Sequence, residues 1–391
     1  MSDAAPESVQ PDSSVPKRRG KVRKRHTVGK VMLASVLVLA MATGLTTIWL
    51  YRHLNSNLNV LDPSAQLSDR PEKLEVEGPK EPLNVLVMGS DNRDCEGCNI
   101  DNLTGGAARS DTTILLHVSA DRQRAYGISI PRDSMVDRPE CRTEDGDTIP
   151  GSDYAMWNEA FALGGPACTI QQFEQLTGVR LDHFVVVDFE GFRGMVDAVG
   201  GVEMCIPEPI VDLAHGINIE EGTRKLKGYE ALNYVRARYT VGNGSDVGRM
   251  KRQQAFIASM TSAVVSAGTL ARPDRLIRFL DAATDSLTVD PGLKNIVKIA
   301  ELGIQFKDTG LDKVQFTTIP IIPDPSDPNR LVWAEPQASE AWAKIAADEP
   351  LTKKLGEDVI TAGNLPGSGS DSAGPRNEAD AQALEEAGLC T

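Results

Sequence analysis

Residues 31–51 form a run of apolar and small residues without a single charged side chain. In a helix that rises about 1.5 Å per residue, this run is long enough to cross the ~30 Å hydrocarbon core of a bilayer. It ends in Trp49 and Tyr51, aromatic residues of the kind that anchor a helix at the membrane surface. A cleaved signal peptide, the alternative, has an apolar core of only about 7–15 residues. The run therefore predicts an uncleaved transmembrane helix.

The flanks of this run predict its orientation. Residues 17–30 contain eight basic side chains and no acidic one. Because basic flanks remain on the cytoplasmic side, we expect residues 1–30 to be a cytoplasmic tail and the C-terminal part of the chain to be extracytoplasmic. Residues 52–82 are polar and contain several prolines, which predicts a stalk. The chain is thus expected to be a single-pass protein of the cell membrane.

The charge of the chain limits its partners. The formal net charge is −14, and residues 1–30 hold eight basic and three acidic side chains, so the remainder carries −19. A domain this acidic is unsuited to general binding of nucleic acids. An anionic substrate must instead meet a local cluster of basic side chains.

All cysteines lie beyond the predicted span, in a compartment that can be oxidising, and their number is even. We therefore expect disulfides. The alternative for the first, closely spaced pair is half of a zinc site, but no second CxxC and no paired histidines follow it. The order of the cysteines suggests the pairs Cys95–Cys98, Cys141–Cys168 and Cys205–Cys390.

Between residues 83 and 350, β-branched apolar runs alternate with helical patterns, and no polar linker interrupts them. This pattern predicts one large α/β domain of mixed α+β type, with a central, largely antiparallel or mixed sheet flanked by helices. Residues 351–391 are expected to be a flexible tail tied back by Cys390. The predicted strands are 84–88, 112–118, 124–130, 183–189, 202–206 and 314–320, and the predicted helices are 154–163, 167–177, 189–199, 228–238 and 245–266.

Charged residues gather at the ends of the first three predicted strands. Asp91 and Arg93 follow the first strand, Arg109 and Asp111 precede the second, and Arg132 follows the third. Adjacent antiparallel strands bring such ends together, and the edge of an α/β sheet is a usual place for ligands. Asp91 and Asp111 are then a candidate pair for a hard cation such as Mg²⁺. Each residue taken singly also fits a structural turn or salt bridge.

A second cluster of basic residues lies between positions 234 and 254. Arg249, Arg252 and Gln253 are at positions i, i+3 and i+4, which share one face of a helix. Guanidinium groups bind phosphate oxygens in a bidentate manner, so converging arginines in an acidic domain favour a diphosphate ligand. An exposed basic helix face is the alternative. The cluster comprises Arg236, Arg238, Asp246, Arg249, Lys251, Arg252 and Gln253.

Several common catalytic motifs are absent from the sequence. It has few histidines and no GxSxG elbow, which argues against a Ser-His hydrolase. It also has no GxGxxG or GxxxxGK[ST] loop and no HExxH motif, so a nucleotide site or a zinc protease is not expected.

Taken together, these segments resemble the LytR-CpsA-Psr (LCP) family of bacterial cell-wall enzymes, of the actinobacterial type. The resemblance spans roughly residues 83–265 and rests on NVLVMGSDNRD, RSDTTILLHV, ISIPRDS, FVVVDFEGFRGMVDAVGGVEMCIPEPI, LKGYEALNYVRARY and SDVGRMKRQQAFI, in this order. Members of the family have a short basic cytoplasmic tail, one membrane span and an extracytoplasmic domain. The resemblance implies a phosphotransferase that moves a glycopolymer from a polyprenyl diphosphate carrier to peptidoglycan, usually forming a phosphodiester at a muramic acid 6-hydroxyl.

The resemblance also implies roles for particular residues. Asp91 and Asp111 are expected to bind Mg²⁺ or Mn²⁺ beside the diphosphate. Phosphoryl transfer depends mainly on positioning and on the neutralisation of charge, which arginines and a metal supply. Asp133 and Asp246 are both candidates for the base that takes the acceptor proton, and neither is preferred. The expected catalytic residues are Arg93, Arg109, Arg132, Arg236 and Arg238, and the expected substrate-binding residues are Arg249, Arg252, Gln253 and Asp246.

An apolar groove for the isoprenoid tail is a further implication of the resemblance. Candidates for its lining are Phe189, Phe192, Met195, Val199, Phe256 and Met260, and ordinary core packing is the alternative for each. Two regions depart from the family pattern, namely the insert between Arg93 and Arg109 and the chain after residue 266. The alternatives to a transferase are a non-catalytic, membrane-tethered binder or envelope regulator, and a polyprenyl diphosphate hydrolase. Hydrolysis is also expected as a side reaction of the transferase.

Overall fold

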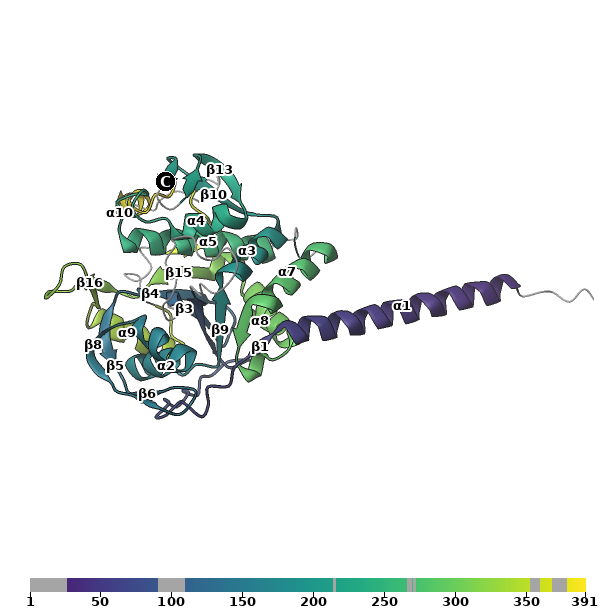
Figure 1. Cartoon of the computed structure of the whole chain (residues 1–391), viewed down its shortest axis with the longest axis horizontal. Helices are drawn as coiled ribbons and strands as arrows, with labels where there is room; N and C mark the ends of the chain where they lie inside the picture. Colours follow the sequence, from purple (N-terminus) through teal and green to yellow (C-terminus); the bar gives the residue numbers. More distant parts are fainter. Residues whose placement is uncertain are drawn as a thin grey trace, which may run out of the picture. The chain divides into compact units, whose positions relative to one another are not determined.

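The computed structural model describes residues 27–90, 110–213, 216–265, 269, 272–351, 359–367 and 378–391. The chain divides into two units, Met1–Leu50 and Tyr51–Thr391. The described residues of the first unit belong to α1 (Thr27–Asn57). Within the described ranges, α1 is the one helix that is long and apolar enough to cross a membrane by length and composition. The last turns of α1 and all other described elements belong to the second unit (Figure 1).

A mixed β-sheet forms the centre of the second unit. Its described strands follow the order β1-β14-β9-β2-β3-β4-β15-β18. Strands β2, β3 and β4 are antiparallel neighbours, whereas β9 runs parallel to β2 and β15 runs parallel to β4. This arrangement confirms the mixed sheet that the sequence predicts. The bounds are β1 Asn59–Val60, β2 Leu83–Ser90, β3 Ser110–Val118, β4 Ala125–Ile130, β9 His183–Asp188, β14 Leu287–Val289, β15 Val314–Thr318 and β18 Ile360–Thr361.

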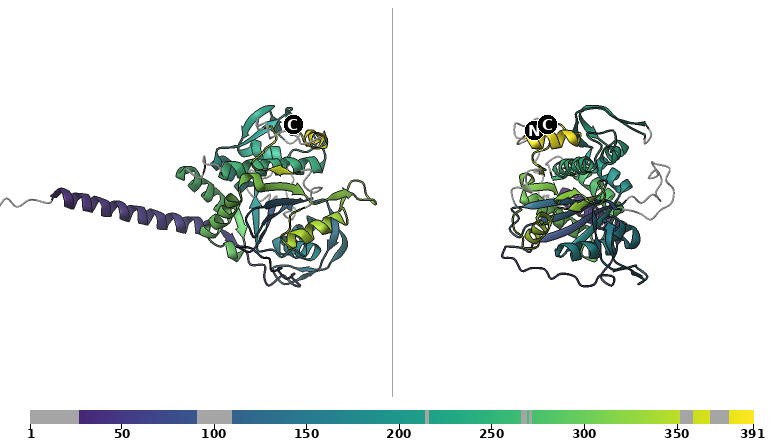
Figure 2. Two further views of the ribbon diagram at one scale, coloured as in Figure 1. Left: turned by 180° about the vertical axis from the view of Figure 1, so that it is seen from behind. Right: turned by 90° about the vertical axis from the view of Figure 1, so that its left-hand side faces the viewer.

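Helices cover both faces of this sheet (Figures 1 and 2). On one face lie α2 and α9, and on the other lie α3, α4 and α5. Helix α7 packs against α3, and α10 packs against α5. The bounds are α2 Glu159–Thr177, α3 Phe189–Val199, α4 Gly228–Arg236, α5 Asp246–Val265, α7 Pro273–Ser286, α8 Ile296–Thr309, α9 Gln337–Ala346 and α10 Glu378–Glu386, with short 3₁₀ helices at Pro291–Leu293 and Leu311–Lys313.

The alternation of side chains along the central strands explains why there are two apolar layers. Leu86, Met88 and Leu115 are buried in the core beneath α2 and α9, where Phe173 and Trp342 make an edge-on ring contact at 5.6 Å. Successive residues of a strand point to opposite faces, so the side chains between them in sequence face α3 and α5. The candidate site described below lies on that second face.

Short two-stranded sheets surround the central one. Three of them lie close to the site: β5 pairs with β8, β11 pairs with β12, and β16 pairs with β17. Their bounds are β5 Met135–Arg138 with β8 Ser152–Met156, β6 Cys141–Arg142 with β7 Thr148–Ile149, β10 Val202–Ile206 with β13 Gly222–Leu226, β11 Ile210–Asp212 with β12 Ile217–Ile219, and β16 Ile321–Pro323 with β17 Leu331–Trp333.

One predicted helix begins later than expected. Residues 152–156 form β8 and pair with β5, so the prediction of a helix from residue 154 is wrong there, and α2 begins at Glu159. Inside α2, Gly164 and Gly165 have non-helical backbone angles immediately before Pro166. A residue that precedes proline avoids the helical region, which accounts for this break between the two predicted helices.

The segment predicted as a stalk lies along the folded unit. Leu54 and Leu58 are buried, only 3% and 9% exposed, and Asn59–Val60 forms the edge strand β1. Farther along, the Arg70 guanidinium forms a two-pronged ion pair with the buried carboxylate of Glu174, at 2.6 and 2.5 Å. Apolar burial and ion pairs therefore tie residues 52–82 to the domain, which proline content alone does not reveal.

The described part of the C-terminal segment is also folded. The predicted disulfides Cys141–Cys168 and Cys205–Cys390 are both present, whereas the Cys95–Cys98 pair lies outside the described residues. Leu384 and Leu389 join the apolar layer of α4 and α5. The chain end therefore packs against the helices that line the site.

Candidate active site

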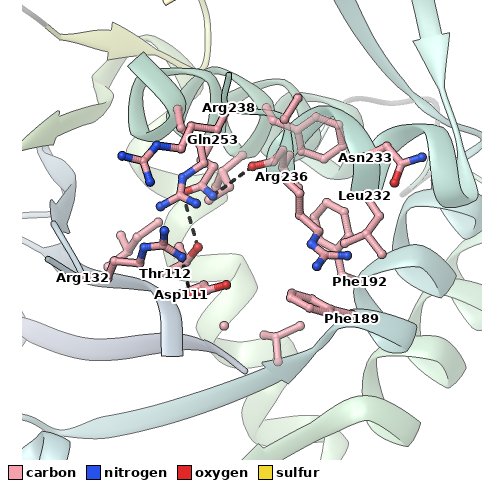
Figure 3. Close-up of a pocket in the computed structure, with 18 of the residues that line it drawn as sticks. Asp111, Thr112, Arg132, Phe189, Phe192, Leu232, Asn233, Arg236, Arg238 and Gln253 are labelled. Carbon is pink, nitrogen blue, oxygen red and sulfur yellow. Dashed lines mark hydrogen bonds and ion pairs between the residues drawn. The ribbon is translucent and has the colours of Figure 1, made fainter. Parts of the chain in front are cut away.

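A cavity of about 660 Å³ lies between the sheet and the layer of α3, α4 and α5. Side chains from β2, β3 and β9 form its floor, and those of the three helices form its roof. One end is lined by arginines and carboxylates, and the other by aromatic and aliphatic side chains (Figure 3). The cavity is therefore amphipathic along its length.

The apolar end is built mainly by α3 and α5. The rings of Phe192 of α3 and Phe256 of α5 contact each other at a centroid distance of 5.4 Å, tilted by 42°. Of the residues expected to line an apolar groove, only Val199 is not at the cavity, because it is buried in the core below α3. The apolar lining includes Val87, Ile114, Val187, Phe189, Phe192, Met195, Ile217, Leu232, Val235, Phe256, Ile257 and Met260.

The polar end is organised around Asp246, the first residue of α5. Its buried carboxylate lies 2.6 Å from Arg249 Nη2, 3.7 Å from Arg132 Nη2 and 3.8 Å from Arg238 Nε, all measured to Oδ1. Arg132 also donates a hydrogen bond of 2.7 Å to Asp111 Oδ1. The structure thus brings together five of the residues that the sequence singles out, from four segments of the chain.

The local folding of each segment explains this convergence. Asp111 is the second residue of β3 and Arg132 follows β4, and the antiparallel pairing of these strands places the two ends side by side. Arg238 follows the C-terminus of α4. Asp246 and Arg249 are in the first turn of α5, three residues apart and hence on the same face of the helix.

Burial and charge shift the pKa values of these arginines in opposite directions. Burial alone would lower the pKa of Arg132, but the carboxylates of Asp111 and Asp246 hold this pKa above its usual value. Burial lowers the pKa of Arg249, against the opposing effect of Asp246 and with a further contribution from Arg132. Arginine is so basic that both groups remain cationic at neutral pH, and the cluster can bind anionic oxygens.

Two further predicted residues line the cavity between its polar and apolar ends. Gln253 donates a hydrogen bond of 3.1 Å to the carbonyl of Val235 and accepts one of 3.3 Å from Thr112, so it links α4, α5 and β3. The guanidinium of Arg236 lies 5.0 Å above the ring of Phe189. Figure 3 shows both side chains at the transition from charged to apolar lining.

Arg252 does not line the cavity. Its side chain is completely buried on another side of α5 and donates hydrogen bonds to the carbonyls of Ala237 and Ala387. Burial lowers its pKa to about 10, so it also remains charged at neutral pH. The guanidinium thus contacts backbone oxygens behind the site.

Three expected site residues, Asp91, Arg93 and Arg109, lie outside the described residues. Before this gap, Ser90 at the end of β2 pairs with Ser110, the neighbour of Asp111. Among the residues that the structure describes, no group of three His, Cys, Asp or Glu side chains is arranged to hold a metal ion. Asp111 is therefore the one described carboxylate of the expected metal pair.

The structure adds residues to the site that the sequence does not single out. Arg330, from the turn between β16 and β17, lines the cavity and lies 3.9 Å from Asp133 Oδ1. Asn158, immediately before α2, also lines it. Neither residue belongs to a recognisable motif, although the proline-containing turn before Arg330 predicts a reversal of the chain there.

The fold and the cavity define a mixed α/β domain that combines a cationic site with an apolar chamber. The LytR_cpsA_psr family model matches residues 51–346, and the chain belongs to this family.

Curated relatives include proteins of cell-wall synthesis. The chain is 36% identical over 216 residues to the probable cell wall biosynthesis protein LcpB of Corynebacterium glutamicum. This match covers 54% of this chain and 48% of LcpB. It is 25% identical to the polyisoprenyl-teichoic acid–peptidoglycan teichoic acid transferase TagV of Bacillus subtilis, over 81% of this chain and 76% of TagV. The matched region spans about half the length of LcpB and of LcpA from the same Corynebacterium.

Solved structures share the fold. A LytR-Csp2A-Psr enzyme from Actinomyces oris superposes with a TM-score of 0.56 at 18% identity, covering 78% of this chain and 98% of that one. TagT bound to LIIa-WTA superposes with a TM-score of 0.51 at 21% identity, covering 76% and 99%.

Proposed function

We propose that the protein is a phosphotransferase that moves a glycopolymer from a polyprenyl diphosphate carrier to the muramic acid 6-hydroxyl of peptidoglycan. One observation carries the proposal: a cluster of arginines, of which Arg249 is buried and Arg132 and Arg238 are partly buried, lines the same cavity as a set of aromatic and aliphatic side chains. A polyprenyl diphosphate has the same two parts, an anionic head and a long apolar tail. The relatives named as transferases of polyisoprenyl-linked teichoic acid to peptidoglycan support this assignment.

The polar end suits the chemistry of phosphoryl transfer. The oxygen of the acceptor hydroxyl forms a bond to the phosphorus that carries the glycopolymer. The bond from this phosphorus to the bridging oxygen of the diphosphate breaks, and polyprenyl monophosphate leaves. Arg132, Arg238 and Arg249 neutralise the charge on the phosphate oxygens, which is the main requirement of such a reaction.

The carboxylates of the site divide into distinct roles. Asp246 lies within 4 Å of three guanidinium groups, so it holds the arginines in place. Asp133 lines the cavity beside Arg132 and Arg330 and is the better placed of the two candidate bases to accept the proton of the acceptor. Its role as the base is part of the proposal.

Asp111 fits one part of a Mg²⁺ or Mn²⁺ site. It is a partly exposed carboxylate at the cavity, and Mg²⁺ typically uses one or two carboxylates together with phosphate oxygens and water. Asp91 is the proposed second carboxylate. A bound cation would supply further neutralisation of the diphosphate charge.

The proposed location follows from the N-terminal helix. The basic residues before α1 favour a cytoplasmic N-terminus and an extracytoplasmic domain. A lipid carrier held in the outer leaflet is then within reach of a domain tethered to the same membrane.

The proposal is tested by incubating the full-length protein in detergent with a polyprenyl diphosphate saccharide, with and without peptidoglycan fragments. We expect release of polyprenyl monophosphate and a saccharide–phosphate–peptidoglycan product. EDTA should abolish release and Mg²⁺ should restore it. Arg238→Ala should lower the rate at least 100-fold. Arg278→Ala, a change at an exposed arginine on α7, is the matched control.

Each alternative has its own outcome. Donor binding without any release of polyprenyl monophosphate would identify a binder or regulator. Release that is unchanged by acceptor, and no phosphodiester product, would identify a hydrolase.

A further inference from the structure

The hairpin of β16 and β17 places one more arginine, Arg330, at the site. This part of the chain carries no recognisable motif. The backbone amide of Arg330 donates to the carbonyl of Asp327 at 2.8 Å, and its own carbonyl accepts from Asp324 at 2.9 Å. The next residue, Leu331, bridges to Ser134. Because Ser134 follows directly on Arg132 and Asp133, this bridge fixes Arg330 beside them.

The side chain of Arg330 is held more loosely than those of Arg132 and Arg249. It is 36% exposed, whereas Arg249 is 8% exposed. Its ion pairs within the described chain, to Asp133 and Asp327, are 3.9 and 4.0 Å long. Those of Arg132 with Asp111 and of Arg249 with Asp246 are 2.7 and 2.6 Å. Arg330 also donates to the sulfur of Met156 at 3.0 Å, a weak acceptor. Its guanidinium therefore retains donors for an incoming group.

The position of Arg330 assigns it to one side of the reaction. The apolar chamber beneath α3 and α5 takes the tail of the carrier, so the donor occupies the inner part of the cavity. Arg236, Arg238 and Arg249 come from α4, α5 and the segment between them, whereas Arg330 comes from the hairpin wall. An acceptor has to approach the phosphorus from the side opposite the leaving group. The acceptor is assigned to the hairpin wall, where the side chain of Arg330 is partly exposed.

We propose that Arg330 binds a carboxylate on the acceptor and so makes this site select an anionic glycan or a glycan that carries an acidic peptide. This inference rests on the proposed transferase function and specifies its acceptor side. A guanidinium matches a carboxylate with two parallel hydrogen bonds, which a lysine cannot reproduce. Arg330 thereby contributes to the affinity for the acceptor, whereas Arg236, Arg238 and Arg249 determine the affinity for the donor.

The test compares two soluble acceptors, one with a free carboxylate and the same compound with that carboxylate amidated. Transfer from a short-chain prenyl diphosphate saccharide is measured with the full-length protein, Arg330→Gln, Arg330→Lys and the exposed control Arg278→Gln. Arg330→Gln should raise KM for the free-acid acceptor by about 10- to 100-fold, while KM for the donor stays the same. Arg330→Lys should show an intermediate value. For the amidated acceptor, all four proteins should have the same high KM.

A binding measurement keeps the two proposals separable. Titration calorimetry with the free-acid acceptor alone, without donor, should show the same loss of affinity in Arg330→Gln and none in Arg278→Gln. Equal affinities for both acceptors in the wild type, or an unchanged KM in Arg330→Gln, would overturn the role of Arg330 even if transfer is robust. Absence of transfer by the wild type, with acceptor binding that still depends on Arg330, would overturn the proposed reaction and not the binding site. An equal midpoint of thermal unfolding confirms that each variant is folded.

Discussion

Arg252 of α5 donates a hydrogen bond of 2.8 Å to the carbonyl of Ala387, which lies 135 residues farther along the chain. The same guanidinium donates to the carbonyl of Ala237, between the cavity residues Arg236 and Arg238. The fully buried guanidinium of Arg252 therefore connects the C-terminal segment to the backbone between Arg236 and Arg238. The Cys205–Cys390 disulfide closes the same segment onto the domain.

Replacing Arg252 by Met should destabilise the fold. Met fills much of the space but leaves two buried carbonyls unpaired, at a cost of about 1–3 kcal/mol each. We expect the free energy of unfolding to fall by about 3 kcal/mol in urea titrations that follow tryptophan fluorescence. Arg278→Met, at an exposed position, should change it by less than ~0.5 kcal/mol. Equal stability of the two variants would contradict a bracing role for Arg252.

Replacing Asp246 by Asn should lower transfer activity without removing a group that reacts. The carboxylate of Asp246 faces Arg132, Arg238 and Arg249. Burial lowers the pKa of Arg249, and the negative charge of Asp246 raises it again in part. Without this carboxylate, the guanidiniums repel one another and leave their positions. We expect kcat/KM for the lipid donor to fall by about 100-fold. Asp274→Asn, which removes an exposed carboxylate of α7, is the control, and an equal effect of both changes would exclude this role.

Filling the apolar chamber should discriminate between donors by the length of their tails. Met260 lines the chamber, and Met260→Trp would occupy space that hydrocarbon is proposed to fill. Since each buried methylene contributes about 0.8 kcal/mol, KM for a long-chain donor should rise at least 10-fold. A donor with a single short prenyl unit should show little change. If both donors respond alike, the tail does not enter this chamber.

The sequence predicts the central sheet and most of the arginine cluster because both depend on local patterns. Alternating apolar residues mark β2, β3 and β4, and their antiparallel order brings Asp111 to Arg132. The spacing of Asp246, Arg249 and Gln253 is likewise a property of one helix. The order of the cysteines along the chain predicts a Cys205–Cys390 disulfide, and this prediction is confirmed.

Other features depend on contacts that no local pattern encodes. Arg252 shares a helical spacing with Arg249, yet α5 is buried on more than one side, and the C-terminal segment determines which partners Arg252 finds. Arg330 reaches the site only because Leu331 bridges to Ser134, far away in sequence. Polar composition suggests a free stalk before residue 82, but Leu54 and Arg70 fix that segment through tertiary contacts.

The stability of the domain should fall at low pH through Asp348. Its carboxylate contacts His117 Nε2 at 3.1 Å and accepts from the amide of Ala120 at 2.9 Å. Burial would raise the pKa of Asp348, but these hydrogen bonds and the charge of Arg124 hold it below the ordinary value of 3.8. The folded state thus favours the ionised carboxylate. This contribution is fully present above pH 3.8 and is lost as the pH falls through the lower pKa of the folded state.

Urea titrations at a series of pH values between neutral and acidic conditions measure this contribution. Asp348→Asn should be less stable than the wild type at neutral pH and should show a shallower decline toward acidic pH. Parallel declines in the two proteins would place the acid sensitivity elsewhere.

Two N-terminal deletions separate the anchor from the fold. Removal of residues 1–50 deletes the first unit and keeps Leu54 and Leu58, whereas removal of residues 1–62 also deletes these leucines and β1. Burial of a leucine contributes about 1.5–3 kcal/mol, so the longer deletion should be less stable by roughly 3 kcal/mol or more in urea titrations. The shorter deletion should unfold like the second unit of the intact protein.

The shorter deletion then isolates the contribution of the membrane helix to function. It retains every described cavity residue, so transfer from short-chain donors in solution should match that of the full-length protein. In cells, a secreted form without α1 has to find a carrier that is confined to the membrane, and wall attachment of the glycopolymer should decline. Equal attachment by the anchored and the secreted forms would mean that the helix only delivers the domain across the membrane. A decline in cells together with full activity in solution would mean that tethering supplies the local concentration of enzyme at the bilayer surface that the lipid carrier requires.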